Sequence, residues 1–187
     1  MPLTVPQSST ESSFGTSHRQ VRQVEAVQKA LLLPGAPLWV KSSRSRGAKA
    51  KGRQFERSFG KRLKRELSAK GAPPWTLLTQ PWLRYWENEE VHEVSPDFVL
   101  LDEAAGRGAV VETKLTRSVD ARLQLLGLYR PLVKWLWPNV EWSYVQAFKN
   151  WAGQADVVVA DTWEETLLWI ASKPHPSPYF EFFWRGQ

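Results

Sequence analysis

Apolar residues spaced four apart predict a helix in the first third of the chain. Phe55, Phe59, Leu63 and Leu67 recur at helical spacing, so their side chains fall on one face that can pack against a core. Gly71 and the two prolines soon after it are typical of the end of a helix. We therefore expect an amphipathic helix that is closed near Gly71.

Two apolar runs in the middle of the chain predict a β-hairpin. Residues 98–101 form a short apolar run after a proline, and residues 109–115 are rich in β-branched side chains. Gly106 and Gly108 lie between the runs and favour a turn. The pattern predicts strand, turn and strand.

This hairpin would gather three charged side chains. Side chains alternate across a strand, so Glu112 and Lys114 project from the same face. Asp97 stands at the start of the partner strand, and pairing across the turn brings it beside Glu112. We expect two carboxylates and one ammonium at one point on the sheet.

The rest of the chain alternates between shorter apolar runs and breaks that contain proline or glycine. A helix is expected over His18–Leu33, and a leucine-rich helix over Val119–Trp137 that is capped by Thr116 or Ser118 and interrupted near Pro131. Strands are expected over residues 75–78, 81–86, 141–149, 156–160 and 179–184, a short helix over 162–171, and a solvated turn that includes Glu87, Glu89 and Glu90. The fold class predicted is α/β with a mixed sheet.

Composition narrows the class of protein. The 187 residues suit one domain with a core of its own, and the absence of cysteine excludes disulfides and thiolate metal sites. No apolar run reaches the length of a membrane span, and the first residues lack a signal-peptide pattern. We expect no membrane partner and a cytoplasmic location. Residues 1–17 are rich in Ser, Thr and Pro, which is typical of disorder.

The positive charge is concentrated in one segment. The formal net charge is +6, yet residues 41–70 alone hold twelve Lys or Arg and two acids, while the remainder of the chain is net acidic. A solvated basic helix is the plain interpretation, but solvated helices usually mix both signs. One-signed charge favours contact with phosphates. The candidate DNA contacts are Arg44, Arg46, Lys49, Lys51, Arg53, Arg57 and Lys61.

The hairpin acids indicate a divalent cation. Carboxylates placed side by side repel unless a cation offsets their charge, and Mg²⁺ takes one or two carboxylates together with water and phosphate oxygens. The alternative for Glu112 and Lys114 is an ion pair on the surface of an ordinary hairpin. Glu56, an acid within the basic segment, is either a third carboxylate aimed at the metal or the partner of Arg53 in an intrahelical pair.

The order of these residues resembles the PD-(D/E)XK nuclease superfamily, in which Pro-Asp precedes Glu-x-Lys, here Pro96-Asp97 and Glu112-Thr113-Lys114. Residues 51–57 resemble the opening helix of archaeal-type Holliday-junction resolvases, where a glutamate matching Glu56 joins the other acids. Residues 49–150 are also similar to phage-encoded members, which carry a Gln and a Tyr on the later helix, matched by Gln124 and Tyr129.

The resemblance implies a restriction-endonuclease-like αβββαβ core over residues 41–187 with a C-terminal extension, preceded by a disordered start and a short helix over residues 1–40. It implies that Glu56, Asp97, Glu112 and Lys114 are catalytic, and that Glu56, Asp97, Glu112 and the Thr113 carbonyl bind Mg²⁺ or Mn²⁺. Gln124 would be a supporting residue beside the metal ligands, or else part of a polar helix face. Tyr129 fits less well, because the family spacing to Gln124 is commonly four.

Three classes of function follow. The first is a metal-dependent endonuclease, selective for branched DNA if it acts as the resolvases do, forming a homodimer if it cuts two strands symmetrically and working in the host cytoplasm if a phage encodes it. The second is a DNA-binding module of the same fold without catalysis. The third is a phage structural or interaction protein, suggested by the aromatic residues 179–184. The sequence does not decide between DNA and RNA.

Overall fold

The computed structural model describes residues 22–24, 26–38, 47–69, 74–150 and 178–184, and it has two β-sheets. Five strands form a mixed sheet in the order β2-β5-β6-β7-β8, and three form a smaller antiparallel sheet in the order β1-β3-β4. The strands are β1 (Lys29–Leu33), β2 (Thr76–Thr79), β3 (Trp82–Glu87), β4 (Glu90–Val94), β5 (Phe98–Asp102), β6 (Arg107–Thr116), β7 (Glu141–Asn150) and β8 (Tyr179–Phe183).

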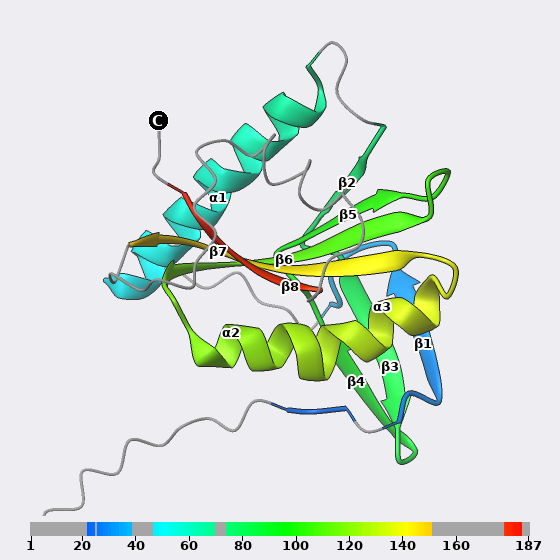
Figure 1. The fold of residues 1–187 in the computed structure, drawn as a ribbon. Helices are drawn as coiled ribbons and strands as arrows, with labels where there is room; N and C mark the ends of the chain where they lie inside the picture. Colours follow the sequence, from blue (N-terminus) through cyan, green and yellow to red (C-terminus); the bar gives the residue numbers. More distant parts are fainter. Residues whose placement is uncertain (1–21, 25, 39–46, 70–73, 151–177, 185–187) are drawn as a thin grey trace, which may run out of the picture.

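The larger sheet combines both strand directions. The pairs β2–β5 and β5–β6 are antiparallel, whereas β6–β7 and β7–β8 are parallel. Helix α1 (Ala48–Leu67) lies on one face, and a helical segment of α2 (Val119–Leu123), η1 (Gln124–Tyr129) and α3 (Arg130–Leu136) lies on the other (Figure 1). The expected α/β class with a mixed sheet is confirmed, while the specific restriction-endonuclease-like core stays a prediction.

The apolar stripe of α1 anchors that helix to the sheet. Phe55, Phe59 and Leu63 are buried, and Leu67 packs at the edge of the same cluster. The cluster includes Phe98 on β5, the first strand of the hairpin. The predicted stripe is confirmed, whereas Gly71 lies outside the described residues.

A second cluster fills the space on the opposite face. Leu125, Leu128 and Leu132 of the helical segment are buried there against β6 and β7. Leu83 and Tyr85 of β3 join the same cluster. The helical segment is therefore held between the two sheets (Figure 1).

The helix expected over His18–Leu33 is wrong for the described part of that range. Lys29–Leu33 is strand β1, which pairs antiparallel to β3 with Ala30 opposite Tyr85. The pairing buries Ala30 in the second cluster. Spacing of valines and leucines suited a helix, but hydrogen bonding to a strand more than fifty residues away decided the local structure.

The solvated turn expected at residues 87–90 is partly wrong. Glu87 is only 4% exposed and forms an ion pair with Arg22 at 2.9 Å between Nη2 and Oε2. The turn itself is made by Asn88 and Glu89, both with positive φ, as a two-residue hairpin requires. Glu90 is exposed and opens β4, a strand that the sequence pattern did not predict.

The helix expected over Val119–Trp137 is present but irregular. Ser118 caps it, because its Oγ accepts a hydrogen bond from the Ala121 N–H at 3.3 Å. The interruption is a π-helical turn, η1, that comes before Pro131, and Pro131 itself stands in the first turn of α3. The helix ends at Leu136.

The remaining expectations fall partly within the described residues and partly outside them. Strands β2, β3, β7 and β8 confirm the runs predicted near residues 75–78, 81–86, 141–149 and 179–184. The predictions for residues 1–17, 156–160 and 162–171 lie outside the described residues. Within the described ranges, no helix is long and apolar enough to cross a membrane.

Candidate active site

The hairpin of β5 and β6 places Asp97 against the second strand. Phe98 pairs with Val111, so Asp97 comes level with Glu112 just beyond the paired region. The N–H and the hydroxyl of Thr113 both donate to Oδ2 of Asp97, at 2.7 and 2.6 Å. These two bonds fix the aspartate beside the strand that carries Glu112 and Lys114, as the sequence predicted.

Glu112 and Lys114 both lie on β6 and form an ion pair with each other. Lys114 Nζ donates to Glu112 Oε2 at 3.0 Å. The Glu112 side chain is 3% exposed and that of Lys114 is 35% exposed. The alternative of a surface pair is therefore wrong for Glu112, because its carboxylate is almost wholly removed from water.

Glu56 reaches the hairpin from α1 through a residue that sequence reasoning missed. The Gln80 side-chain amide donates to Glu56 Oε1, and the Gln80 backbone N–H donates to the Asp97 carbonyl at 2.8 Å. Gln80 has a positive φ of 47°, which is unusual for a residue with a side chain. A polar residue between β2 and Pro81 gives no signal in the sequence, so this bridge could be found only in the structure.

A glycine allows the close approach of α1 to β5. A Cβ on Gly60 would lie 2.7 Å from the ring of Phe98, closer than real contacts allow. Gly60 is one turn after Glu56, and Phe98 follows Asp97. The missing side chain thus lets the helix acid come near the hairpin acid.

Burial and mutual repulsion disfavour the charged forms of two of these acids. Burial, followed by the charge of Asp97, raises the pKa of Glu112 to about 7 although Lys114 opposes the shift. Burial and then the same Asp97 charge raise the pKa of Glu56, against the hydrogen bond from Gln80. The negative charge of Asp97 therefore acts on both glutamates. A bound cation would offset the repulsion among the three carboxylates.

Lys114 stays an ammonium group in this setting. Burial acts to lower its pKa, but the carboxylates of Glu112, Asp97 and Glu56 outweigh that effect and raise it. A cationic Lys114 can donate hydrogen bonds and offset negative charge. It does not suit the role of proton acceptor.

The π-helical turn brings Gln124 and Tyr129 together. Five residues along a regular α-helix turn a side chain about 140° away from its starting direction, yet Gln124 Nε2 donates to the Tyr129 hydroxyl at 2.8 Å. The Tyr129 hydroxyl also reaches the Ser95 carbonyl at 3.1 Å and the Glu112 carboxylate. Gln124 therefore acts on the acids through Tyr129, and the five-residue spacing is no obstacle to their pairing.

A groove of about 630 Å³ opens between α1 and the start of β3, next to the acids. Glu56 and Asp97 line it together with Gln80, Ser95 and Trp82. Its helical wall carries the cations Arg53, Arg57, Lys61 and Lys64.

The groove separates the candidate DNA contacts into groups. Arg53, Arg57 and Lys61 line it, and Lys64 is an addition that the sequence analysis did not select; their contact with DNA stays a prediction. Lys49 and Lys51 are exposed near the start of α1, away from the groove lining. Arg44 and Arg46 lie outside the described residues.

The donor set suits Mg²⁺ by its chemistry. Asp97 and Glu112 supply hard carboxylate oxygens and Thr113 a carbonyl, which with water is a usual set for this ion. Burial first, and then the charge of Asp97, raise the pKa values of Glu56 and Glu112, and a bound cation would oppose both effects. In the described part of the chain, however, no three His, Cys, Asp or Glu side chains form a ready-made metal-binding group.

Comparison with known proteins gives no match to a protein-family model, to a curated protein or to a solved structure. The assignment of a function therefore depends on the site itself.

Proposed function

We propose that the protein is a Mg²⁺-dependent endonuclease that hydrolyses phosphodiester bonds of DNA. The observation that carries the proposal is the meeting of Glu56 from α1, Asp97 from just before β5, and Glu112 with Lys114 from β6. Of these, Glu56 and Asp97 line a groove whose helical wall is cationic. Residues from three separate parts of the fold form this charged cluster, whereas an ordinary surface ion pair involves only two neighbouring side chains.

In this proposal the groove binds the DNA backbone and positions it beside the acids. Arg53, Arg57, Lys61 and Lys64 would neutralise successive phosphates along one wall. Contacts of this kind hold the backbone without reading the bases. The proposal therefore includes selection by the shape or strand structure of DNA.

The chemical step is an attack of water on phosphorus with release of the sugar oxygen. Bound Mg²⁺, held by Asp97, Glu112 and the Thr113 carbonyl, would supply positive charge to the reacting phosphate. Lys114 donates a hydrogen bond to the attacking water or to a phosphate oxygen and offsets the charge that develops there.

Glu56 suits the role of proton acceptor. It is partly exposed in the groove, and its raised pKa brings it nearer to neutral pH, where a general base works best. The proton leaves the attacking water for the Glu56 carboxylate as the new P–O bond forms. The leaving oxygen takes its proton from solvent as the old P–O bond breaks.

The test is cleavage of supercoiled plasmid and of fluorescent forked and four-way DNA, with Mg²⁺ and with EDTA. We expect cleavage that needs Mg²⁺ and that falls at least about a hundredfold in Asp97→Asn and in Lys114→Met. Glu103→Gln is the matched control, because Glu103 is an exposed acid in the turn of the same hairpin. Equal cleavage by wild type and Asp97→Asn would refute the site.

One observation favours a second candidate, a DNA-binding module that does not cleave. The described residues hold no ready-made group of three metal-binding side chains. In that case the wild type would bind DNA through the same groove, but would cleave none of these substrates with Mg²⁺ or Mn²⁺.

A further inference from the structure

The outer face of the three-stranded sheet carries two tryptophans in a row. Side chains of β3 alternate, so that Leu83, Tyr85 and Glu87 are buried on one side, where Leu83 and Tyr85 pack in the cluster that includes α3. The residues between them face the other way. Those outward residues are Trp82, Arg84 and Trp86, all partly exposed.

The neighbouring strands extend this face with apolar and cationic side chains. Leu31 on β1 stands opposite Arg84 and is 41% exposed, and Val91 on β4 stands opposite Trp86 and is 53% exposed. Lys29 on β1 is also opposite Trp86, with its Nζ 5.1 Å from the centre of the indole ring. Exposed apolar residues gathered on one sheet face are typical of a binding surface.

Lys29 gives this face a cation, whereas the charge of Arg84 is offset by an ion pair with Glu93. Arg84 is fixed between the tryptophans by Glu93, whose Oε1 accepts from Arg84 Nε at 2.8 Å. Lys29 is exposed and has no acid opposite it in the register of β1 with β3. Flat rings alternating with cations suit a ligand made of bases and phosphates.

The face continues into the groove of the candidate active site. Trp82 lines that groove together with Glu56 and Asp97. Trp86 lies four residues further along β3, which is about 13 Å in an extended strand. A chain of nucleotides leaving the acids past Trp82 would therefore meet Arg84 and then Trp86.

We infer that this face binds single-stranded nucleic acid, with unpaired bases stacked on Trp82 and Trp86 and phosphates beside Lys29 and Arg84. In a duplex the bases are stacked on each other and paired, so their faces are not open to a tryptophan, whereas a single strand offers them. The inference rests on the proposed nuclease function and refines it: the substrate has an unpaired strand next to the bond that is cut.

The experiment measures binding apart from cleavage. Fluorescence anisotropy in EDTA would follow the full chain binding to labelled oligo(dT) and to a duplex of equal length at the same salt concentration. We expect Trp86→Ala to weaken binding of oligo(dT) about tenfold, as loss of one stacking contact does, and to change binding of the duplex little. Trp86→Phe keeps a ring and should retain most of the affinity.

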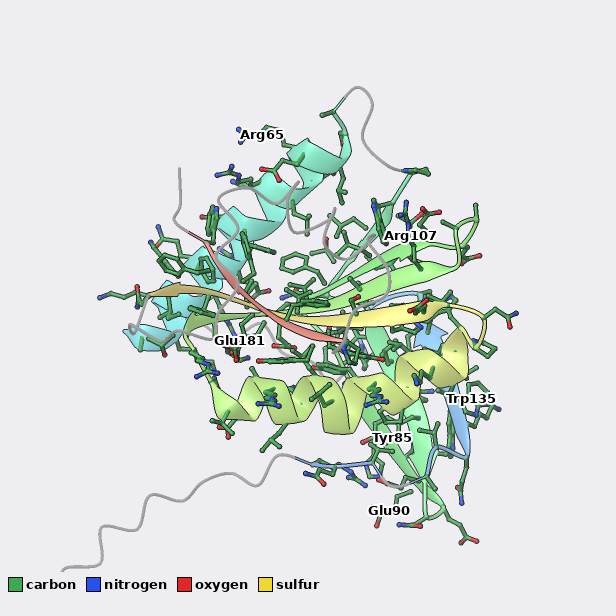
Figure 2. All side chains as sticks on the ribbon, viewed as in Figure 1. Arg65, Tyr85, Glu90, Arg107, Trp135 and Glu181 are labelled. Atoms are coloured by element: carbon green, nitrogen blue, oxygen red, sulfur yellow. The ribbon has the colours of Figure 1, made fainter. Side chains whose placement is uncertain are left out.

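The matched control is Trp135→Ala. Trp135 is a more exposed tryptophan, at 44%, on α3, the helix that lies on the other side of the small sheet (Figure 2). Lys29→Gln, a change at an exposed position, gives a second variant that should fold normally. It should lower the slope of log affinity for oligo(dT) against log salt by about 0.7.

Several results would overturn the inference. One is that Trp86→Ala binds oligo(dT) as tightly as wild type. Another is that Trp135→Ala loses as much affinity for oligo(dT) as Trp86→Ala does. A third is that Trp86→Ala loses as much affinity for the duplex as for oligo(dT). A dimer in analytical ultracentrifugation that Trp86→Ala converts to a monomer would show that the face binds a second copy instead. The nuclease proposal fails separately, if the wild type binds oligo(dT) through Trp86 but cleaves no DNA with Mg²⁺.

Discussion

The ring of Phe98 occupies the space where a side chain on Gly60 would stand. A Cβ at position 60 would lie 2.7 and 2.9 Å from two ring carbons of Phe98, which is itself 1% exposed and closely packed. The contact joins α1 to β5 beside Glu56 and Asp97. It is the point at which the fold sets the separation of the helix acid from the hairpin acid.

Gly60→Ala should therefore destabilise the protein and lower cleavage. Overpacking of a filled core costs about 1–3 kcal/mol, more than the gain of about 0.5–1 kcal/mol that alanine gives in a helix. Urea unfolding would measure the stability, and plasmid cleavage the activity. Gly52→Ala on the same helix is the control, because a Cβ there meets nothing within 4 Å, and it should stabilise. A Gly60→Ala protein as stable as Gly52→Ala would contradict the role of this contact.

The buried Glu112 carboxyl predicts a dependence of stability on pH. Its pKa of about 7 in the folded protein lies above its ordinary value of 4.5, so the folded state binds the proton more tightly. Stability from this group is complete below pH 4.5 and is lost as the pH rises through 7, by about 3 kcal/mol at most.

Glu112→Gln removes that titration. In EDTA, the stability of the variant relative to wild type should rise between pH 5 and pH 8, measured by urea unfolding at each pH. Mg²⁺ should recover part of the loss for the wild type at pH 8 and little for Glu112→Gln. If the unfolding free energies of the two proteins change with pH in parallel, Glu112 is ionised to the same extent in the folded and unfolded states, which would contradict the prediction.

Tyr129→Phe should shift the pH dependence of cleavage. The Tyr129 hydroxyl has one proton for two acceptors, the Ser95 carbonyl and the Glu112 carboxylate, and its hydrogen bond lowers the pKa of Glu112. Without it that pKa rises, so the rate should fall more at pH 7 than at pH 8.5. The loss of stability should be about 1 kcal/mol.

Tyr179→Phe is the control for that change. Its hydroxyl also bonds a carboxylate, Glu181 Oε1, at 2.9 Å, but on β8, which β7 separates from the strand of Glu112. We expect the rate profile of Tyr179→Phe to follow that of wild type. A shift of equal size in both variants would mean that Tyr129 acts through general stability alone.

Lys61→Gln should weaken DNA binding mainly at low salt. Lys61 lines the groove, and removal of one phosphate contact lowers the slope of log affinity for duplex DNA against log salt by about 0.9. Arg65→Gln is the control, because Arg65 is exposed near the C-terminal end of α1 and is not among the groove residues (Figure 2). Equal slopes for Lys61→Gln and wild type would remove the groove from the binding site.

The parts of the fold that the sequence predicted are those that local periodicity controls. The stripe of Phe55, Phe59 and Leu63 follows from one helix face that packs against a core. The apolar run along residues 109–115 follows from a strand with a core on each side. The pairing of Asp97 with the strand of Glu112 then followed from the turn. The place of Glu56 beside them did not follow from these short-range rules, but was implied by the resemblance to the nuclease superfamily.

The parts that were missed depend on distant partners. Residues 29–33 became a strand because β3 offered a pairing edge, and Glu87 is buried because Arg22 reaches it. Gln80 and Gly60 matter through what faces them across the fold. No pattern within a window of ten or twenty residues contains that information.

The π-helical turn between Gln124 and Tyr129 has a consequence for the history of such sites. A protein that lost one residue between these two positions and returned to a regular α-helix would bring the same pair together at a spacing of four. A one-residue insertion or deletion at this turn can therefore be tolerated in evolution without loss of the contact between the glutamine and the tyrosine. Sites of this kind that share an ancestor can then differ in the number of intervening residues, and a sequence search with a fixed gap would miss them.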